Sequence, residues 1–180
     1  MWGVDLTYIR MVGGVGVGGQ KAYPGWLYLV AVLDWYSRYI VSWELSQDMG
    51  EEFVLQAARA ALAKAIPSIW NSDQGSQFTS PQYTGLLEAA GVQISMDGRG
   101  RFVDNIFTER LWRNIKYEEV YLHEYTNPRE ARQSLGNYIH FYNHERPHQA
   151  LDYQTPAVVY HRIAGQHHHQ RLPRKEEISP

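Results

Sequence analysis

The chain has 180 residues, of which 44% are hydrophobic and 13% aromatic, and this is enough to build one domain with a substantial core. Its longest apolar run, Trp26 to Leu33, is far too short to cross a bilayer, so we expect a soluble, cytoplasmic protein that is not held by a membrane. There is no cysteine, which excludes disulfides and thiolate metal sites, and the formal net charge is −2.

The first part of the chain predicts three consecutive strands. Residues 2–10 alternate in polarity, residues 25–34 are almost continuously apolar, and residues 39–45 suit the strand that follows. Six glycines and one proline lie within residues 11–25, which indicates a long loop. We therefore expect an antiparallel meander with a glycine-rich insertion at 11–25.

Helices and strands alternate after this meander. We expect a helix at 51–65, a strand at 68–71, a helix at 81–90, a strand at 92–96, a helix carrying Glu109 to about residue 120, and a last long helix from Pro128. This order predicts an α/β fold with a five-stranded mixed sheet, in which three antiparallel strands are followed by two parallel ones and helices cover both faces. The core domain is expected to span 1–160. Residues 161–180 are basic and His-rich, and they predict a disordered tail.

Three carboxylates lie where regular elements begin or end. Asp5 is central in the first strand, Asp73 follows the fourth strand, and Glu109 lies near the start of a helix, with 35 residues between the last two. Three such side chains can bind two divalent cations, and a two-metal site of this kind can catalyse in-line displacement at a phosphodiester. Each also has an ordinary alternative. Asp5 can face solvent, Asp73 can cap the next helix, and Glu109 can pair with Arg113 one turn later.

The segments that carry these residues resemble bacterial insertion-sequence transposases. They are residues 4–8, residues 73–80 (Asp-Gln-Gly-Ser-Gln-Phe-Thr-Ser), residues 104–112, and residues 142–151 (Tyr-Asn-His-Glu-Arg-Pro-His-Gln-Ala-Leu). The chain is similar to the catalytic domain of the "insertion sequence three" family, which shares the fold and the Asp, Asp, 35 residues, Glu pattern of retroviral integrases. The resemblance implies a ribonuclease-H-like fold. It also implies that Asp5, Asp73 and Glu109 are the catalytic ligands of two Mg²⁺ ions, for which Mn²⁺ can substitute.

The same resemblance implies roles for residues around the three carboxylates. Asp104 and Asn105 would cap the helix of Glu109 and support the metal ligands from behind. The residues expected to contact DNA are Gln74, Arg110, Arg113, Lys116, Arg146 and His148. Two alternatives stay open. Arg113 and Lys116 share a helix face with Glu109 and can instead form a salt-bridged surface stripe, and the segment of Arg146 and His148 can be a structural cap between a helix and a loop.

The implied function is metal-dependent DNA cleavage and strand transfer in transposition. The implied partners are the inverted-repeat ends of a mobile element, target DNA, and further copies of the chain in an active homo-oligomer at the bacterial nucleoid. Family members carry a helix-turn-helix region before the catalytic domain, and this chain begins almost on its first strand, so we expect weak recognition of element ends. Two other functions remain open, a ribonuclease-H-like nuclease and an inactive truncated remnant that only binds DNA or partner subunits.

Overall fold

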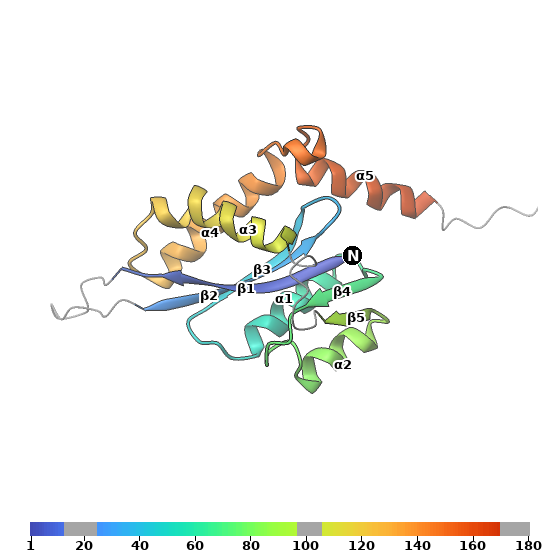
Figure 1. Ribbon diagram of the computed structural model, residues 1–180, viewed down its shortest axis with the longest axis horizontal. Coiled ribbons are helices and arrows are strands. Elements are labelled where there is room, and N and C mark those ends of the chain that lie inside the picture. The colour runs from blue at the N-terminus through green and yellow to red at the C-terminus, as the bar shows by residue number, and fades with distance from the viewer. Residues whose placement is uncertain (13–24, 97–105, 170–180) are drawn as a thin grey trace, which may run out of the picture.

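The computed structural model describes residues 1–12, 25–96 and 106–169. Its strands are β1 (Trp2–Arg10), β2 (Trp26–Asp34), β3 (Ile40–Ser46), β4 (Ile69–Ser72) and β5 (Gln93–Met96). Its helices are α1 (Glu52–Leu62), α2 (Pro81–Ala89), α3 (Ile106–Glu118), α4 (Pro128–His144) and α5 (Pro156–His169), with the short 3-10 turns η1 (Val120–Leu122) and η2 (Gln149–Leu151). Figure 1 labels the strands and the α-helices and colours them from blue to red in chain order.

All five strands form one mixed sheet in the order β3-β2-β1-β4-β5. Strand β2 is antiparallel to both β1 and β3, whereas β4 is parallel to both β1 and β5. The predicted fold class is therefore confirmed, including the change from antiparallel to parallel pairing after the third strand. This arrangement makes β1 and β4 neighbours although they are far apart in the sequence.

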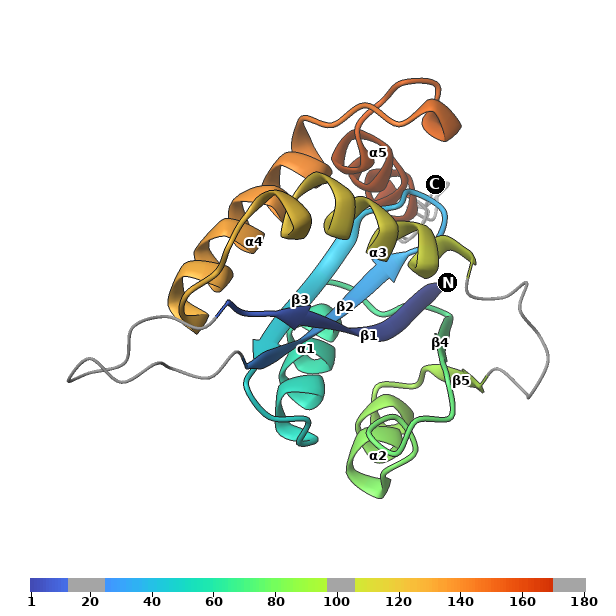
Figure 2. The ribbon, with the colours of Figure 1, turned by 60° about the vertical axis from the view of Figure 1, so that its left-hand side comes forward.

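Two layers of helices cover the sheet, because β2 is apolar on both sides. Its residues 27, 29, 31 and 33 pack in one cluster with side chains of α3 and α4, whereas Val30 and Val32 pack in a second cluster with α1 and α2. This period of two is the signature of a central strand that is buried on both faces. Figures 1 and 2 show α3 and α4 on one face of the sheet and α1 and α2 on the other.

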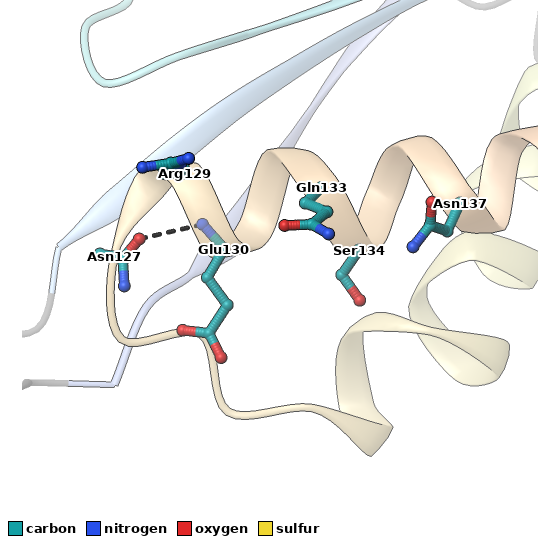
Figure 3. Close-up of a pocket in the computed structure, with 6 residues that line it drawn as sticks. All are labelled: Asn127, Arg129, Glu130, Gln133, Ser134 and Asn137. Atoms are coloured by element: carbon teal, nitrogen blue, oxygen red, sulfur yellow. Dashed lines mark hydrogen bonds between the residues drawn. The ribbon is translucent and has the colours of Figure 1, made fainter.

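Two helices begin with the caps that their sequences predict. Ser80 accepts a hydrogen bond from the backbone of Tyr83 at 3.2 Å, with Pro81 in the first turn of α2. Asn127 accepts one from the backbone of Glu130 at 2.9 Å and starts α4 in the same way, as Figure 3 shows. These local hydrogen bonds fix where each helix leaves the preceding loop.

The long connection between β1 and β2 is a hairpin at its described ends. The two strands pair along their whole length, from Trp2 opposite Asp34 to Arg10 opposite Trp26, and the Met11 amide donates to the Gly25 carbonyl at 2.9 Å. The strand of Asp5 is therefore regular despite the insertion. The remainder of the predicted insertion, residues 13–24, lies outside the described residues.

The first part of the segment that is predicted as a disordered tail from residue 161 is helical. Helix α5 continues to His169, well past the expected end of the core at residue 160. The Tyr160 ring stacks on Tyr39 with a centroid distance of 4.5 Å, and this packing anchors the first turns. Once a helix has started, each further residue adds a hydrogen bond at little cost, so a polar sequence can prolong it. Residues 170–180 lie outside the described residues.

None of the helices in the described part of the chain combines the length and the apolar character that a membrane span requires.

Asn143 fastens the end of α4 to the start of β3. Its Oδ1 accepts from the Ile40 amide at 2.9 Å and its Nδ2 donates to the Ile40 carbonyl at 3.0 Å, and the side chain is buried. The amide thus satisfies both backbone groups of a strand residue more than a hundred positions away in the sequence. The contacts of Asn143 therefore support a structural role for this residue, as expected if the segment 142–151 is a cap between a helix and a loop.

Replacing Asn143 with alanine should lower the free energy of unfolding by roughly 2–3 kcal/mol, because two buried backbone groups lose their partners. Urea denaturation of the purified chain measures this change. Asn137→Ala is the matched control, since Asn137 is exposed on the same helix. Equal effects of the two substitutions would contradict the assigned role of Asn143.

Candidate active site

Asp5 lies on the face of the sheet that α3 and α4 cover. Its neighbours Val4 and Leu6 pack with the α1 and α2 cluster, so the alternation of the strand turns Asp5 toward α3. The half-buried carboxylate accepts the Leu6 amide hydrogen at Oδ1, at 2.7 Å, and the Trp112 indole hydrogen at Oδ2, at 2.8 Å. The interpretation of Asp5 as an ordinary solvent-facing strand residue does not fit these contacts.

Asp73 follows the last residue of β4 and is exposed. Strands β1 and β4 pair in parallel with Trp2 opposite Trp70 and Gly3 opposite Asn71. If this register is continued by two residues, Asp73 comes opposite Asp5. The Asp73 side chain accepts the Gly75 amide hydrogen at Oδ1, at 2.8 Å, which closes a tight turn and leaves Ser80 as the cap of α2. Ser80, and not Asp73, therefore caps α2.

Glu109 is exposed in the first turn of α3. Trp112 follows it by three residues, and residues at this spacing lie on the same side of a helix. Because the Trp112 indole bonds to Asp5, the side of α3 that bears Glu109 is turned toward β1. Helix α3 is in contact with β1, and Figure 2 shows it crossing above that strand.

The three carboxylates share this part of the molecule without forming a closed metal cluster. Within residues 1–12, 25–96 and 106–169, no three His, Cys, Asp or Glu side chains are close enough together to hold one metal ion. Asp104 and Asn105, the predicted supports of the ligands, lie outside the described residues.

Trp112 is a site residue that the sequence analysis did not identify. It is buried and joins two segments 107 residues apart through its bond to Asp5. The available signal was its spacing of three residues from Glu109, which places both side chains on one helix face. A tryptophan at such a spacing is usually a core residue, and Trp112 is indeed part of the core cluster on this face.

Glu109, Arg113 and Lys116 share one face of α3, but Glu109 and Arg113 do not form the salt bridge that the surface-stripe alternative predicts. No ion pair joins Glu109 to Arg113 among the described residues, and the Arg113 guanidinium instead lies 5.9 Å from the centre of the Tyr117 ring. Arg113 is exposed and Lys116 is half-buried. Gln74, another residue expected to contact DNA, is exposed directly beside Asp73.

Arg146 has a structural partner. Its guanidinium donates to both carboxylate oxygens of Glu118, at 2.8 and 2.5 Å, and the Tyr138 hydroxyl donates to the same carboxylate at 2.9 Å. The hydrogen bond from Arg146 lowers the pKa of Glu118 below its ordinary value. A bidentate pair of this kind ties the loop after α4 to the end of α3, as the structural-cap alternative requires.

Three of the predicted DNA-contacting residues nevertheless meet around one cavity. Arg110 of α3 and Arg146 and His148 of the loop after α4 line a space of about 340 Å³, together with Arg38 from the turn between β2 and β3. Burial lowers the pKa of His148 to about 4, and the positive charge of Arg146 acts in the same direction. Nothing in the local sequence around Arg38 indicated that it belongs to this group.

A second cavity, of about 460 Å³, lies at the N-terminal end of α4 and is shown in Figure 3. Its lining residues are Asn127, Arg129, Glu130, Gln133, Ser134 and Asn137. None of the three candidate carboxylates lines it, and Figure 2 shows the start of α4 remote from the start of α3, where Glu109 lies. We assign this cavity no part in the chemistry.

Comparisons with known proteins agree with the fold. The chain matches the integrase core domain over residues 1–101, and a second integrase core domain family over residues 90–156. Among solved structures, the catalytic core domain of BIV integrase superimposes with a TM-score of 0.67 at 15% identity, over 93% of this chain and 97% of that one. A chain of the simian T-cell lymphotropic virus intasome gives a TM-score of 0.71 at 15% identity, over 99% of this chain and 56% of the other.

Several relatives by sequence are named as transposases. The transposase for insertion sequence element IS904 of Lactococcus lactis is 34% identical over 87% of this chain and 59% of its own length. The putative transposase InsK for insertion sequence element IS150 of Escherichia coli is 30% identical over 86% of this chain and 52% of its own length. The chain thus spans little more than half the length of these relatives. It belongs to the integrase core domain family and corresponds to the catalytic core of bacterial insertion-sequence transposases.

Proposed function

We propose that this domain cleaves DNA and joins the resulting 3′ ends to a new strand, with divalent cations held by Asp5, Asp73 and Glu109. One observation carries the proposal. The Trp112 bond to Asp5 holds the Glu109 side of α3 against β1, and β4, the parallel neighbour of β1, is followed directly by Asp73. Three carboxylates from β1, from the end of β4 and from α3 are thereby directed to one region of the sheet.

The chemistry of the donor set fits hard cations. Carboxylate oxygens are the ligands that Mg²⁺ and Mn²⁺ prefer, and the domain has no cysteine that would favour softer metals. When bound, a pair of such ions would activate the attacking oxygen and stabilise the departing one. Asp73 and Glu109 are exposed and would have to converge on a shared cation, whereas Asp5 is already held by hydrogen bonds.

The side chains of this domain would prepare that displacement. The Trp112 indole and the Leu6 amide each hold one oxygen of Asp5, so the carboxylate keeps its orientation. The phosphorus gains a bond to the oxygen of water or of a DNA 3′-hydroxyl and loses its bond to a 3′-oxygen, which departs with the electron pair and takes up a proton. Arg113 and Lys116, on the Glu109 side of α3, would neutralise flanking phosphates.

By the same proposal, the substrates are the ends of a mobile element and then target DNA, and the active form is an oligomer of the chain. The intasome that shares this fold and the transposases that share this sequence support this choice. The phosphate contacts of a catalytic core position a duplex but do not read its sequence, so we assign end recognition to parts outside this domain.

Metal removal tests the proposal. The purified chain should nick plasmid DNA with Mn²⁺ or Mg²⁺, lose this activity in excess chelator and regain it when Mg²⁺ is restored. Nicking that survives chelation would contradict the proposed ligands. Faster cleavage of RNA–DNA hybrids than of DNA would favour the nuclease alternative, and DNA binding without cleavage under any metal would favour the inactive one.

A further inference from the structure

The cavity between α3 and the end of α4 is lined by basic side chains that three separate segments contribute. Arg38 comes from the turn after β2, Arg110 from α3, and Arg146 and His148 from the loop between α4 and η2. Asn114 adds an amide to the lining. Its volume of about 340 Å³ is ample for a phosphate group with its hydration.

Its positive charge is only partly neutralised. Arg146 is paired with Glu118, but neither Arg38 nor Arg110 has a carboxylate within salt-bridge distance among the described residues. Burial lowers the pKa of Arg38, and the neighbouring charge of Arg110 acts in the same direction, whereas Tyr142 and Asp34 oppose this. Two neighbouring arginines repel each other, and a bound anion between them would offset this repulsion.

The cationic side chains are held in place before any ligand arrives. The Arg38 guanidinium lies 3.5 Å from the centre of the Phe107 ring and donates to the Trp35 carbonyl. Arg146 is fixed by the two bonds to Glu118. His148 Nε2 is buried and has no hydrogen-bond partner in the described structure, which leaves a polar atom of the lining unsatisfied.

The cavity lies on the other flank of α3 from Glu109. Phe107, Arg110, Leu111 and Asn114 line it at spacings of three and four residues and so form one face of the helix. Glu109 follows Phe107 by two residues, and Trp112 follows Arg110 by two residues. Each offset is a rotation of about 200° around the helix. A helix is roughly 10–12 Å across, so a ligand in the cavity is clearly separate from one bound at the carboxylates.

We propose that this cavity binds a backbone phosphate of DNA at a position away from the phosphate that reacts. The inference rests on the proposed function for its choice of DNA. Guanidinium groups bind phosphate oxygens through paired N–H donors, and His148 can add a further donor when it is protonated. The contact would hold a duplex against the outer edge of α3 while Asp5, Asp73 and Glu109 act on the opposite flank.

Replacement of Arg110 by glutamine tests this contact, because Arg110 is exposed and has no ion-pair partner in the described structure. The variant should bind a DNA duplex more weakly, and the slope of log K against log salt should fall by about 0.9, the value for one phosphate contact. Arg129→Gln is the matched control, since it removes the same charge from an exposed position at the distant end of α4. Its slope should equal that of the unmodified chain.

The titration of His148 provides a second measurement. Its neighbours by charge are Arg146, Glu118 and Arg38, and a bound phosphate would offset the arginine charges, so DNA should raise the pKa of His148 from about 4 toward the ordinary value. Ring NMR signals with and without a short duplex measure this shift. Inorganic phosphate at equal ionic strength forms the second arm. A shift with inorganic phosphate but not with DNA would overturn the choice of ligand.

The outcomes separate this inference from the proposed function. If the chain cleaves DNA with metal but Arg110→Gln keeps the full salt slope, the phosphate site is wrong and the catalytic proposal stands. If Arg110→Gln lowers the slope while no metal supports cleavage, the catalytic proposal is wrong and the phosphate site stands. An equal loss of slope in Arg110→Gln and Arg129→Gln would show only a general charge effect and would overturn the site.

Discussion

Asp73→Asn should abolish DNA cleavage while the fold remains intact. The substitution removes a metal-binding charge at nearly constant volume, and the loss of several kcal/mol of transition-state stabilisation corresponds to a rate at least roughly 10³-fold lower. The turn should survive, because the asparagine Oδ1 can still accept the Gly75 amide hydrogen that Asp73 accepts at 2.8 Å. A plasmid nicking assay with Mg²⁺ and a denaturation curve measure the two properties separately.

The chain contains a closely matched control for this variant. Asp48 is also exposed and accepts the amide hydrogen of a glycine two residues later, Gly50, at 3.1 Å. Asp48→Asn therefore makes the same chemical change in the same kind of turn, in the loop between β3 and α1. It should leave cleavage unchanged. Wild-type cleavage by Asp73→Asn, or equal losses in both variants, would remove Asp73 from the catalytic set.

The stability of Asp73→Asn should equal or slightly exceed that of the unmodified chain when metal is absent. Carboxylates that are brought near one another repel, and the variant removes one of the three charges. A stability cost without an activity cost would mean that the Asp73 carboxylate serves the turn rather than the chemistry.

The elements that depend on local sequence were predictable. The polarity alternation of β1, the apolar run of β2 and the Ser80-Pro81 start of α2 are properties of neighbouring residues, and the structure confirms each of them. The positions of Asp5 within β1, of Asp73 after β4 and of Glu109 in α3 follow from the same local patterns. The roles of these three carboxylates remain predictions.

The contacts that hold the site together were not predictable in the same way. The bonds from Trp112 to Asp5 and from Asn143 to Ile40 join residues more than a hundred positions apart, and no local pattern encodes them. Arg38 enters the basic cavity because the turn after β2 adopts a left-handed conformation at that residue, with φ of 63°. The extension of α5 to His169 was not predictable for a related reason, because the first turns of this helix pack on the distant ring of Tyr39.

The end of α4 and the loop after it combine features of both alternatives for the segment 142–151. Asn143 and Arg146 have structural partners in Ile40 and Glu118, as a helix-to-loop cap requires. Arg146 and His148 also line the basic cavity, as a DNA contact requires. A guanidinium paired with one carboxylate through Nε and Nη2 still has donors on Nη1, so the two roles are compatible in a single side chain.

Trp112→Phe should lower the activity by about 10- to 100-fold, the usual loss when a residue that orients a metal ligand is removed. Phenylalanine keeps most of the buried apolar contact but has no N–H for Asp5 Oδ2, which Trp112 binds at 2.8 Å. The carboxylate then loses a hydrogen bond that fixes one of its oxygens, and α3 loses a polar link to β1. We expect the loss to appear mainly as a higher Mg²⁺ concentration for half-maximal cleavage.

That metal dependence distinguishes a positioning role from a purely structural one. Trp43→Phe is the control, because Trp43 is half-buried against the same core cluster and packs beside Arg132 rather than at a carboxylate. Both variants lose the same atoms and should lose some stability, but only Trp112→Phe should shift the Mg²⁺ requirement. If saturating Mg²⁺ restores most of its cleavage rate, the indole acts through the ligand geometry of Asp5. An unchanged Mg²⁺ requirement in Trp112→Phe would mean that the Trp112 bond to Asp5 does not position the carboxylate for metal. Trp112 would then act only through packing, and this bond would not explain how α3 is aligned with β1.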